Sequence, residues 1–144
     1  MIAETLNDLT TASPQEALIY VMVMVSAADA EMTDAELAMI GDTVRHLPVF
    51  RNFEITRLPD VARDCTKHLQ APDGMRHTLH VIRDALPERL RETAYAVACD
   101  MAAADGALSA EEMRLLELLR HELSIDRLHA AAIERGAHAR YLVG

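Results

Sequence analysis

A twelve-residue segment occurs twice in this chain, 76 positions apart and without gaps. The first copy covers residues 26–37 and the second covers residues 102–113, and both contain the pattern D-[AG]-x-[ML]-[ST]-x-x-E after a run of small residues. Each copy predicts an Ala-rich helix that ends near an aspartate, a short turn, and a second helix that begins at a hydroxyl residue. The repetition therefore constrains the fold to two halves built in the same way.

Apolar residues recur at helical spacing along the rest of the chain. Pro59 lies inside one of these patterns, so that helix either begins near Leu58 or is kinked there. Residues 19–25 are strand-forming types, but a single strand would have no partner, so we expect a helix at the centre of a bundle. The predicted fold class is all-α, with about seven helices in two pseudo-symmetric halves. The apolar faces of these helices lie within residues 18–25, 37–47, 55–69, 75–86, 90–101, 115–123 and 125–132. The last of these faces consists of Ile125, Leu128 and Ala132.

Length and composition exclude several classes of protein. The 144 residues fit a single domain, 1–144, and a chain of this length folds without disulfides or a structural metal. The net charge of −9 and an aromatic content of 3% argue against a nucleic-acid partner, because phosphates would be repelled and bases would find few stacking partners. Eight of the acidic residues lie in the first 50 positions, where Arg45 is the only base, so a basic partner would approach there.

The predicted location is the cytoplasm. The longest apolar run, residues 17–28, is shorter than the roughly 20 residues of a spanning helix, so we do not expect the chain to cross a membrane. The N-terminus carries Glu4 and Asp8 where a signal peptide would be positively charged. Cys65 and Cys99 belong to no C-x-x-C motif, which favours a reducing compartment and core positions for both.

The repeated segment has two interpretations. Thr33 with Glu36, and Ser109 with Glu112, match capping boxes, and helix capping alone would select these residues. Asp29 and Asp105 fall at helix C-termini, where the helix dipole disfavours a carboxylate unless a cation neutralises it.

The second copy also matches the second half of an EF-hand loop. The first half is missing, because Met101 and Ala103 stand where the first two ligands belong, so a complete EF-hand is excluded. Two half-loops could instead face each other and pool their carboxylates around one hard cation, namely those of Asp29, Glu36, Asp105 and Glu112.

With this doubled motif, the chain resembles the TerB-like family of tellurite-resistance and stress-response proteins over residues 14–135. The resemblance implies an all-helical fold of about seven helices and an acidic cluster that binds a divalent metal such as calcium. Carried onto this sequence, the cluster consists of Asp29, Glu36, Asp105 and Glu112, with Glu31, Asp34 and Glu111 as outer contributors.

No motif indicates an enzyme or an organic cofactor. The sequence has no phosphate-binding loop, dinucleotide fingerprint or nucleophile elbow. The pairs Cys65–His68 and His77–His80 have zinc-ligand spacing, but Cys65 continues an apolar stripe, which favours the core.

We therefore expect a non-enzymatic, metal-responsive module of a tellurite-resistance or stress-response system, with a divalent cation, calcium above all, and a protein partner in trans. The alternative is an acidic protein-interaction module without metal, in which the carboxylates only cap helices.

Overall fold

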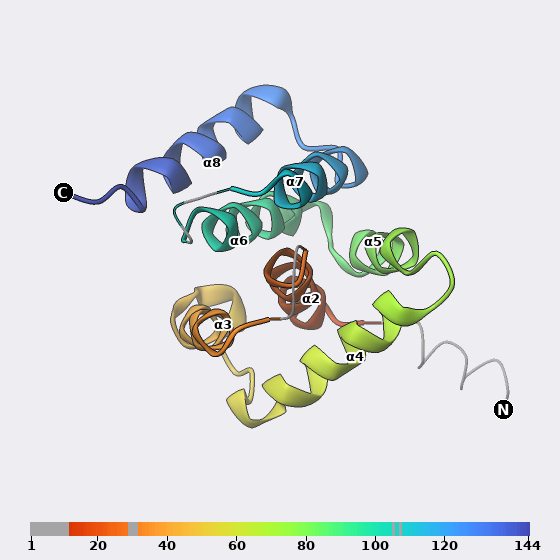
Figure 1. Ribbon diagram of the computed structural model, residues 1–144. Coiled ribbons are helices and arrows are strands. Elements are labelled where there is room, and N and C mark those ends of the chain that lie inside the picture. Colours follow the sequence, from red (N-terminus) through yellow and green to blue (C-terminus); the bar gives the residue numbers. More distant parts are fainter. Residues whose placement is uncertain (1–11, 29–31, 105, 107) are drawn as a thin grey trace, which may run out of the picture.

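Helix α2 (Pro14–Ser26) lies at the centre of the domain, with the other helices around it (Figure 1). In this computed structural model, every residue of α2 from Ala17 to Ser26 is buried. It packs on α6 (Arg91–Ala104), α4 (Leu58–Gln70) and α5 (Gly74–Ala85). Burial on all sides explains why a segment of strand-forming residues is a helix, and the predicted central helix is confirmed.

The structure describes residues 12–28, 32–104, 106 and 108–144. These residues form seven α-helices and three 3-10 turns, and they contain no strand, which confirms the predicted all-α class. The remaining elements are α3 (Asp34–His46), η1 (Pro48–Phe50), η2 (Ile55–Arg57), η3 (Glu88–Leu90), α7 (Ala110–Glu122) and α8 (Arg127–Arg140).

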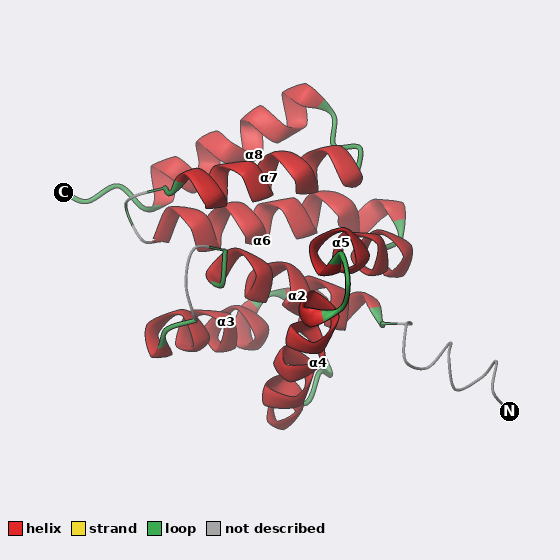
Figure 2. Ribbon diagram, turned by 45° about the vertical axis from the view of Figure 1, so that its right-hand side comes forward, coloured by secondary structure: helices red, strands yellow, loops and turns green. Residues whose placement is uncertain are grey.

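Two helix pairs correspond to the two copies of the repeat, α2 with α3 and α6 with α7. The first helices of the two pairs pack against each other, and α2 also contacts α7. In Figure 2, α2 and α6 run in the same direction, so their C-terminal ends lie on the same side of the domain. The repeated turns therefore begin at neighbouring helix ends.

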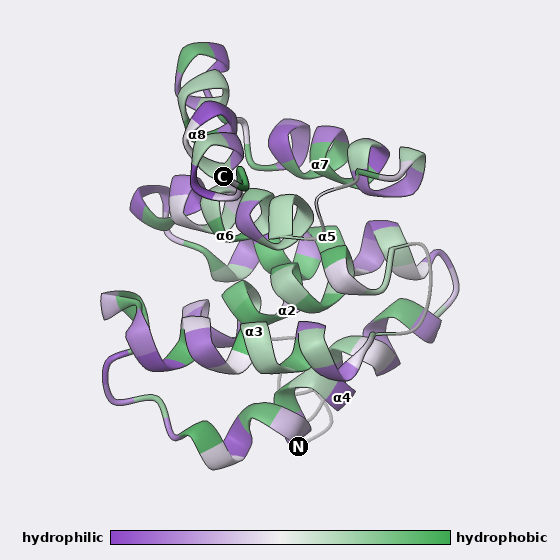
Figure 3. Cartoon of the chain, turned by 60° about the vertical axis from the view of Figure 1, so that its left-hand side comes forward, coloured by the Kyte–Doolittle hydropathy of each residue, from purple (hydrophilic) through white to green (hydrophobic). Residues whose placement is uncertain are grey.

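Apolar residues concentrate on the central helix, whereas α3, α4 and α8 carry hydrophilic stretches as well (Figure 3). Most of the predicted apolar faces are confirmed, but the last one is wrong. Leu128 is 80% exposed and Ala132 is exposed, whereas Ala130 and Ala137 are buried. The helix begins only at Arg127, and the small residues spaced seven apart form the face that packs on α6.

Pro59 does not kink a helix. It stands in the first turn of α4, which begins at Leu58 directly after the 3-10 turn η2. A proline in the first turn removes no helical hydrogen bond, so the position is unstrained. The expected start near Leu58 is confirmed.

Substitutions on α2 and α8 test this arrangement. We expect Met22→Ala to lower the free energy of unfolding by about 2–5 kcal/mol, because the fully buried side chain would leave a cavity. The matched variant Leu128→Ala should change it by less than about 0.5 kcal/mol, because that side chain is mostly in water. Urea unfolding followed by circular dichroism measures both values, and a large loss in Leu128→Ala would contradict the placement of α8.

Candidate functional site

The second copy of the repeat forms a helix turn closed by a capping box. Gly106 has a φ of 76°, the left-handed conformation that glycine adopts without strain. The backbone N–H of Glu112 donates to Ser109 Oγ at 3.0 Å, and the N–H of Ser109 donates to Glu112 Oε1 at 3.1 Å. Both hydrogen bonds satisfy backbone groups that the start of α7 would otherwise leave free.

The first copy has the same geometry at the start of α3. The backbone N–H of Glu36 donates to Thr33 Oγ1 at 3.1 Å, and the N–H of Thr33 donates to Glu36 Oε1 at 2.8 Å. In both copies one carboxylate oxygen serves the cap, and no other hydrogen bond from residues 12–28, 32–104, 106 or 108–144 reaches the carboxylate. Both predicted capping boxes are confirmed.

The two glutamates differ in burial. Glu36 is half-buried, whereas Glu112 is only 3% exposed. Within the part of the chain that the structure describes, no Lys, Arg or His lies within 4 Å of the Glu112 carboxylate. A carboxylate in such a position loses hydration that a cation would replace.

A serine hydroxyl is also buried near this end of the domain, and it has no partner among the described residues. Ser26, the last residue of α2, is 3% exposed, and its hydroxyl forms no hydrogen bond with a described residue. Buried polar groups in proteins are nearly always hydrogen-bonded, so this hydroxyl is unusual. Nothing in the sequence pattern singled it out, because serine is common at helix ends.

Other members of the predicted cluster are placed in different ways. Asp34 and Glu111 are exposed in the first turns of α3 and α7, where the helix dipole favours acidic side chains. Asp29, Glu31 and Asp105 lie outside the described residues. Among the residues that are described, no three His, Cys, Asp or Glu side chains form a metal-holding group. The pooled four-carboxylate site therefore stays a prediction.

Comparison with known families shows that residues 15–135 match the family described as tellurite resistance protein TerB. The chain belongs to the TerB family. The match spans both repeated turns and all helices up to the middle of α8. No curated protein and no solved structure matches the chain.

TerB membership supports a helical module related to tellurite resistance. No helix in the described part of this TerB chain is long and apolar enough to span a lipid bilayer.

A third capping box in this TerB chain was missed in the sequence. Ser13 and Glu16 form it at the start of α2, and the signal S-P-Q-E has the required spacing. Glu16 also accepts a hydrogen bond at 2.9 Å from Arg57, the last residue of η2, so the start of α2 lies beside the segment leading into α4. Arg57 therefore makes an ion pair that joins two segments distant in the sequence.

Two histidines from neighbouring helices form a hydrogen-bonded pair. His68 Nδ1 on α4 lies 2.8 Å from His77 Nε2 on α5. The sequence spacing allowed zinc-ligand pairs within each helix, Cys65–His68 and His77–His80, but favoured a core position for Cys65. Cys65 is fully buried and its thiol donates to the Tyr20 carbonyl, while His80 Nε2 lies 3.4 Å from Glu122 Oε1.

Gly74 makes the histidine pair possible. A Cβ at this position would lie 1.9 Å from the backbone oxygen of Leu69, so only glycine lets α5 begin this close to the end of α4. The close approach places His77 against His68. Burial and the neighbouring His77 lower the pKa of His68, and Asp64 opposes that change.

Neither cysteine is activated for thiol chemistry. Burial raises the pKa of the Cys65 thiol to about 12, and burial also raises that of Cys99 to about 12. Both thiols are free and buried, as expected. Because the thiolate is the reactive form, these residues are poor nucleophiles at neutral pH.

The histidine pair predicts acid sensitivity. Because the pKa of folded His68 lies below the ordinary 6.5, the unfolded chain binds more protons between the two values. The stability that neutral His68 contributes to the folded state is therefore present above about pH 6.5. It is lost as the pH falls through the lowered pKa of His68. His77→Gln removes the neighbouring charge that lowers the pKa of His68, and glutamine can still hydrogen-bond His68. The melting temperature of this variant should therefore fall less between pH 7.5 and pH 5.5 than that of the wild type. His46→Gln, an exposed control, should follow the wild type, and equal losses in all three proteins would refute the prediction.

The raised thiol pKa values predict slow alkylation. At pH 8 only about one thiolate in ten thousand molecules is present at a pKa of about 12, and access is blocked as well. Iodoacetamide should therefore modify Cys65 and Cys99 in urea but leave both unmodified in the folded protein over the same time, as measured by intact-protein mass spectrometry. Rapid modification of the folded chain would show that a thiol is accessible.

Proposed function

We propose that this TerB-family chain is a non-enzymatic, metal-responsive module that binds one divalent cation, calcium above all. The cation would be held by Asp29, Glu36, Asp105 and Glu112, with Glu31, Asp34 and Glu111 as outer contributors. It would tie the two repeated helix turns together and so control a surface for a protein partner in trans.

The burial of Glu112 carries this proposal. Its carboxylate is 3% exposed and has no cationic side chain within 4 Å among the residues whose placement is described. One oxygen accepts the Ser109 N–H, which compensates only part of the lost hydration. A bound cation would neutralise the charge with the hard oxygen ligand that calcium prefers.

The arrangement of the helices gives further support. The C-terminal ends of α2 and α6 lie on the same side of the domain, so the chain leaves both helices toward the same region. Asp29 and Asp105 follow these two ends by three residues and one residue. The proposed ion would therefore draw on carboxylates that follow two neighbouring helices.

The absence of catalysis is part of the proposal. Both thiols are held protonated by burial, and the glutamates of the repeat are engaged in helix caps. A binding role uses these features directly, whereas a reaction would need an activated nucleophile or base.

The alternative function is an acidic interaction module without metal. The observation that favours it is the complete capping geometry of Glu36 and Glu112, which accounts for both residues without an ion. Binding to a basic partner would then weaken with salt and be independent of calcium.

Charge-neutral variants distinguish the two functions. Glutamine at the third helical position preserves a capping box, so Glu112→Gln removes the charge while keeping the cap. At a calcium concentration one hundred times the dissociation constant, the wild type should gain about 2.7 kcal/mol in its free energy of unfolding. Glu112→Gln and Asp105→Asn should lose most of this gain, as measured by urea unfolding with and without calcium.

Glu16→Gln is the matched control, because Glu16 serves a capping box outside the repeat. It should keep the full response to calcium. If calcium does not stabilise the wild type, the metal-binding function is wrong and the acidic interaction module remains. If Glu112→Gln and Asp105→Asn both keep the full response to calcium, the cation binds elsewhere.

A further inference from the structure

A trough of about 460 Å³ lies between α7 and α8, with α6 as its floor. This volume falls within the range of small-molecule sites in proteins, roughly 300–1,000 Å³. The trough exists because α7 and α8 each pack on α6, while the two helices make few contacts with each other. On α8 the buried residues are the small Ala130 and Ala137, and Ala137 lines the trough together with larger side chains such as Glu134 and Leu142.

One end of the trough is apolar and exposed. Leu108, Met113 and Leu142 line it, and they are 46%, 53% and 64% exposed. Covering such neighbouring apolar side chains releases about 25 cal/mol for each Å² removed from water. This end therefore favours a hydrocarbon group of a ligand.

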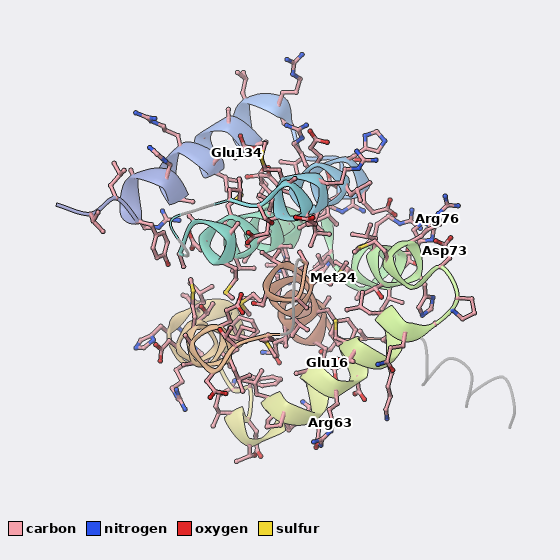
Figure 4. The ribbon with its side chains drawn as sticks, in the orientation of Figure 1. Glu16, Met24, Arg63, Asp73, Arg76 and Glu134 are labelled. Atoms are coloured by element: carbon pink, nitrogen blue, oxygen red, sulfur yellow. The ribbon has the colours of Figure 1, made fainter. Side chains whose placement is uncertain are left out.

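The other end is polar. Tyr95 on the floor donates a hydrogen bond to Glu134 at 2.5 Å, and Glu134 points from α8 toward the body of the domain (Figure 4). Burial, together with this hydrogen bond, raises the pKa of Tyr95, so the phenol stays a donor. Arg120 enters from the last turn of α7.

The charged groups of the trough differ in whether they are already paired. The carboxylate of Glu134 is bound to Tyr95, and that of Glu117 pairs with Arg114 at 3.3 Å. Arg120 is half-buried, and its guanidinium forms no ion pair or side-chain hydrogen bond with any described residue. The interaction left open in the trough is therefore with an anion, and a guanidinium binds a carboxylate with two parallel hydrogen bonds.

The distance between the two ends sets the length of the ligand. Met113 and Arg120 are seven residues apart on α7, which corresponds to about 10 Å along the helix, or roughly eight to ten carbon atoms of an extended chain. We propose that the trough binds a straight-chain monocarboxylate of this length, with its carboxylate on Arg120 and its tail over Met113, Leu108 and Leu142.

Decanoate is the probe for the test. In an amide NMR titration of the full chain, decanoate should cause saturable shifts in residues 95–103, 113–120 and 134–142. Decyltrimethylammonium has the same tail and the opposite charge, and it should bind at least tenfold more weakly. No saturable shift at millimolar decanoate would overturn the proposal, as would equal binding of the two compounds.

Two variants test the assigned ends of the ligand. Arg120→Gln should weaken decanoate binding at least tenfold, whereas Arg135→Gln, on the exposed side of α8 and outside the trough, should leave it unchanged. Ala103→Phe places a ring in the trough and should abolish binding. An unchanged affinity in Arg120→Gln would overturn the proposal, and if that variant does not fold, the comparison of the two charged probes on the wild type decides.

Discussion

The packing of α2 against α6 supports the rest of the domain. Helix α2 is apolar and buried on every side, and α4 and α5 pack directly against it. Helix α6 packs on α2 and also contacts α7 and α8. Both helices of this contact are the first helix of a repeated pair, so the turns that follow them begin at neighbouring positions. The geometry of the candidate metal site therefore depends on the packing of two helices whose buried residues are mostly apolar.

Local sequence signals predicted the features that depend on residues close together in the chain. A hydroxyl residue followed three positions later by a glutamate predicted the capping boxes at Thr33 and Ser109. The spacing of apolar residues predicted the number of helices. Apolar spacing predicted the wrong face for α8. Leu128 fitted the spacing but points to water, whereas Ala130 and Ala137 are the buried residues of this helix. Small residues carry little hydrophobic signal, although close helix packing depends on them.

Contacts between distant residues could not be read from the sequence in the same way. The hydrogen bonds of His68 with His77 and of Tyr95 with Glu134 each join two different helices, and the angle between those helices is set by tertiary packing. Burial is another such property. Glu36 and Glu112 occupy equivalent positions in the repeat, yet only Glu112 is enclosed, so the two copies of one motif contribute differently to the candidate site.

The close approach at Gly74 has a mechanical consequence. The backbone of α5 begins in direct contact with the last turn of α4, and the histidine pair joins the same two helices by their side chains. Two separate connections, one through the backbone and one through side chains, therefore hold α4 and α5 together. A displacement of α4 would move α5 with it.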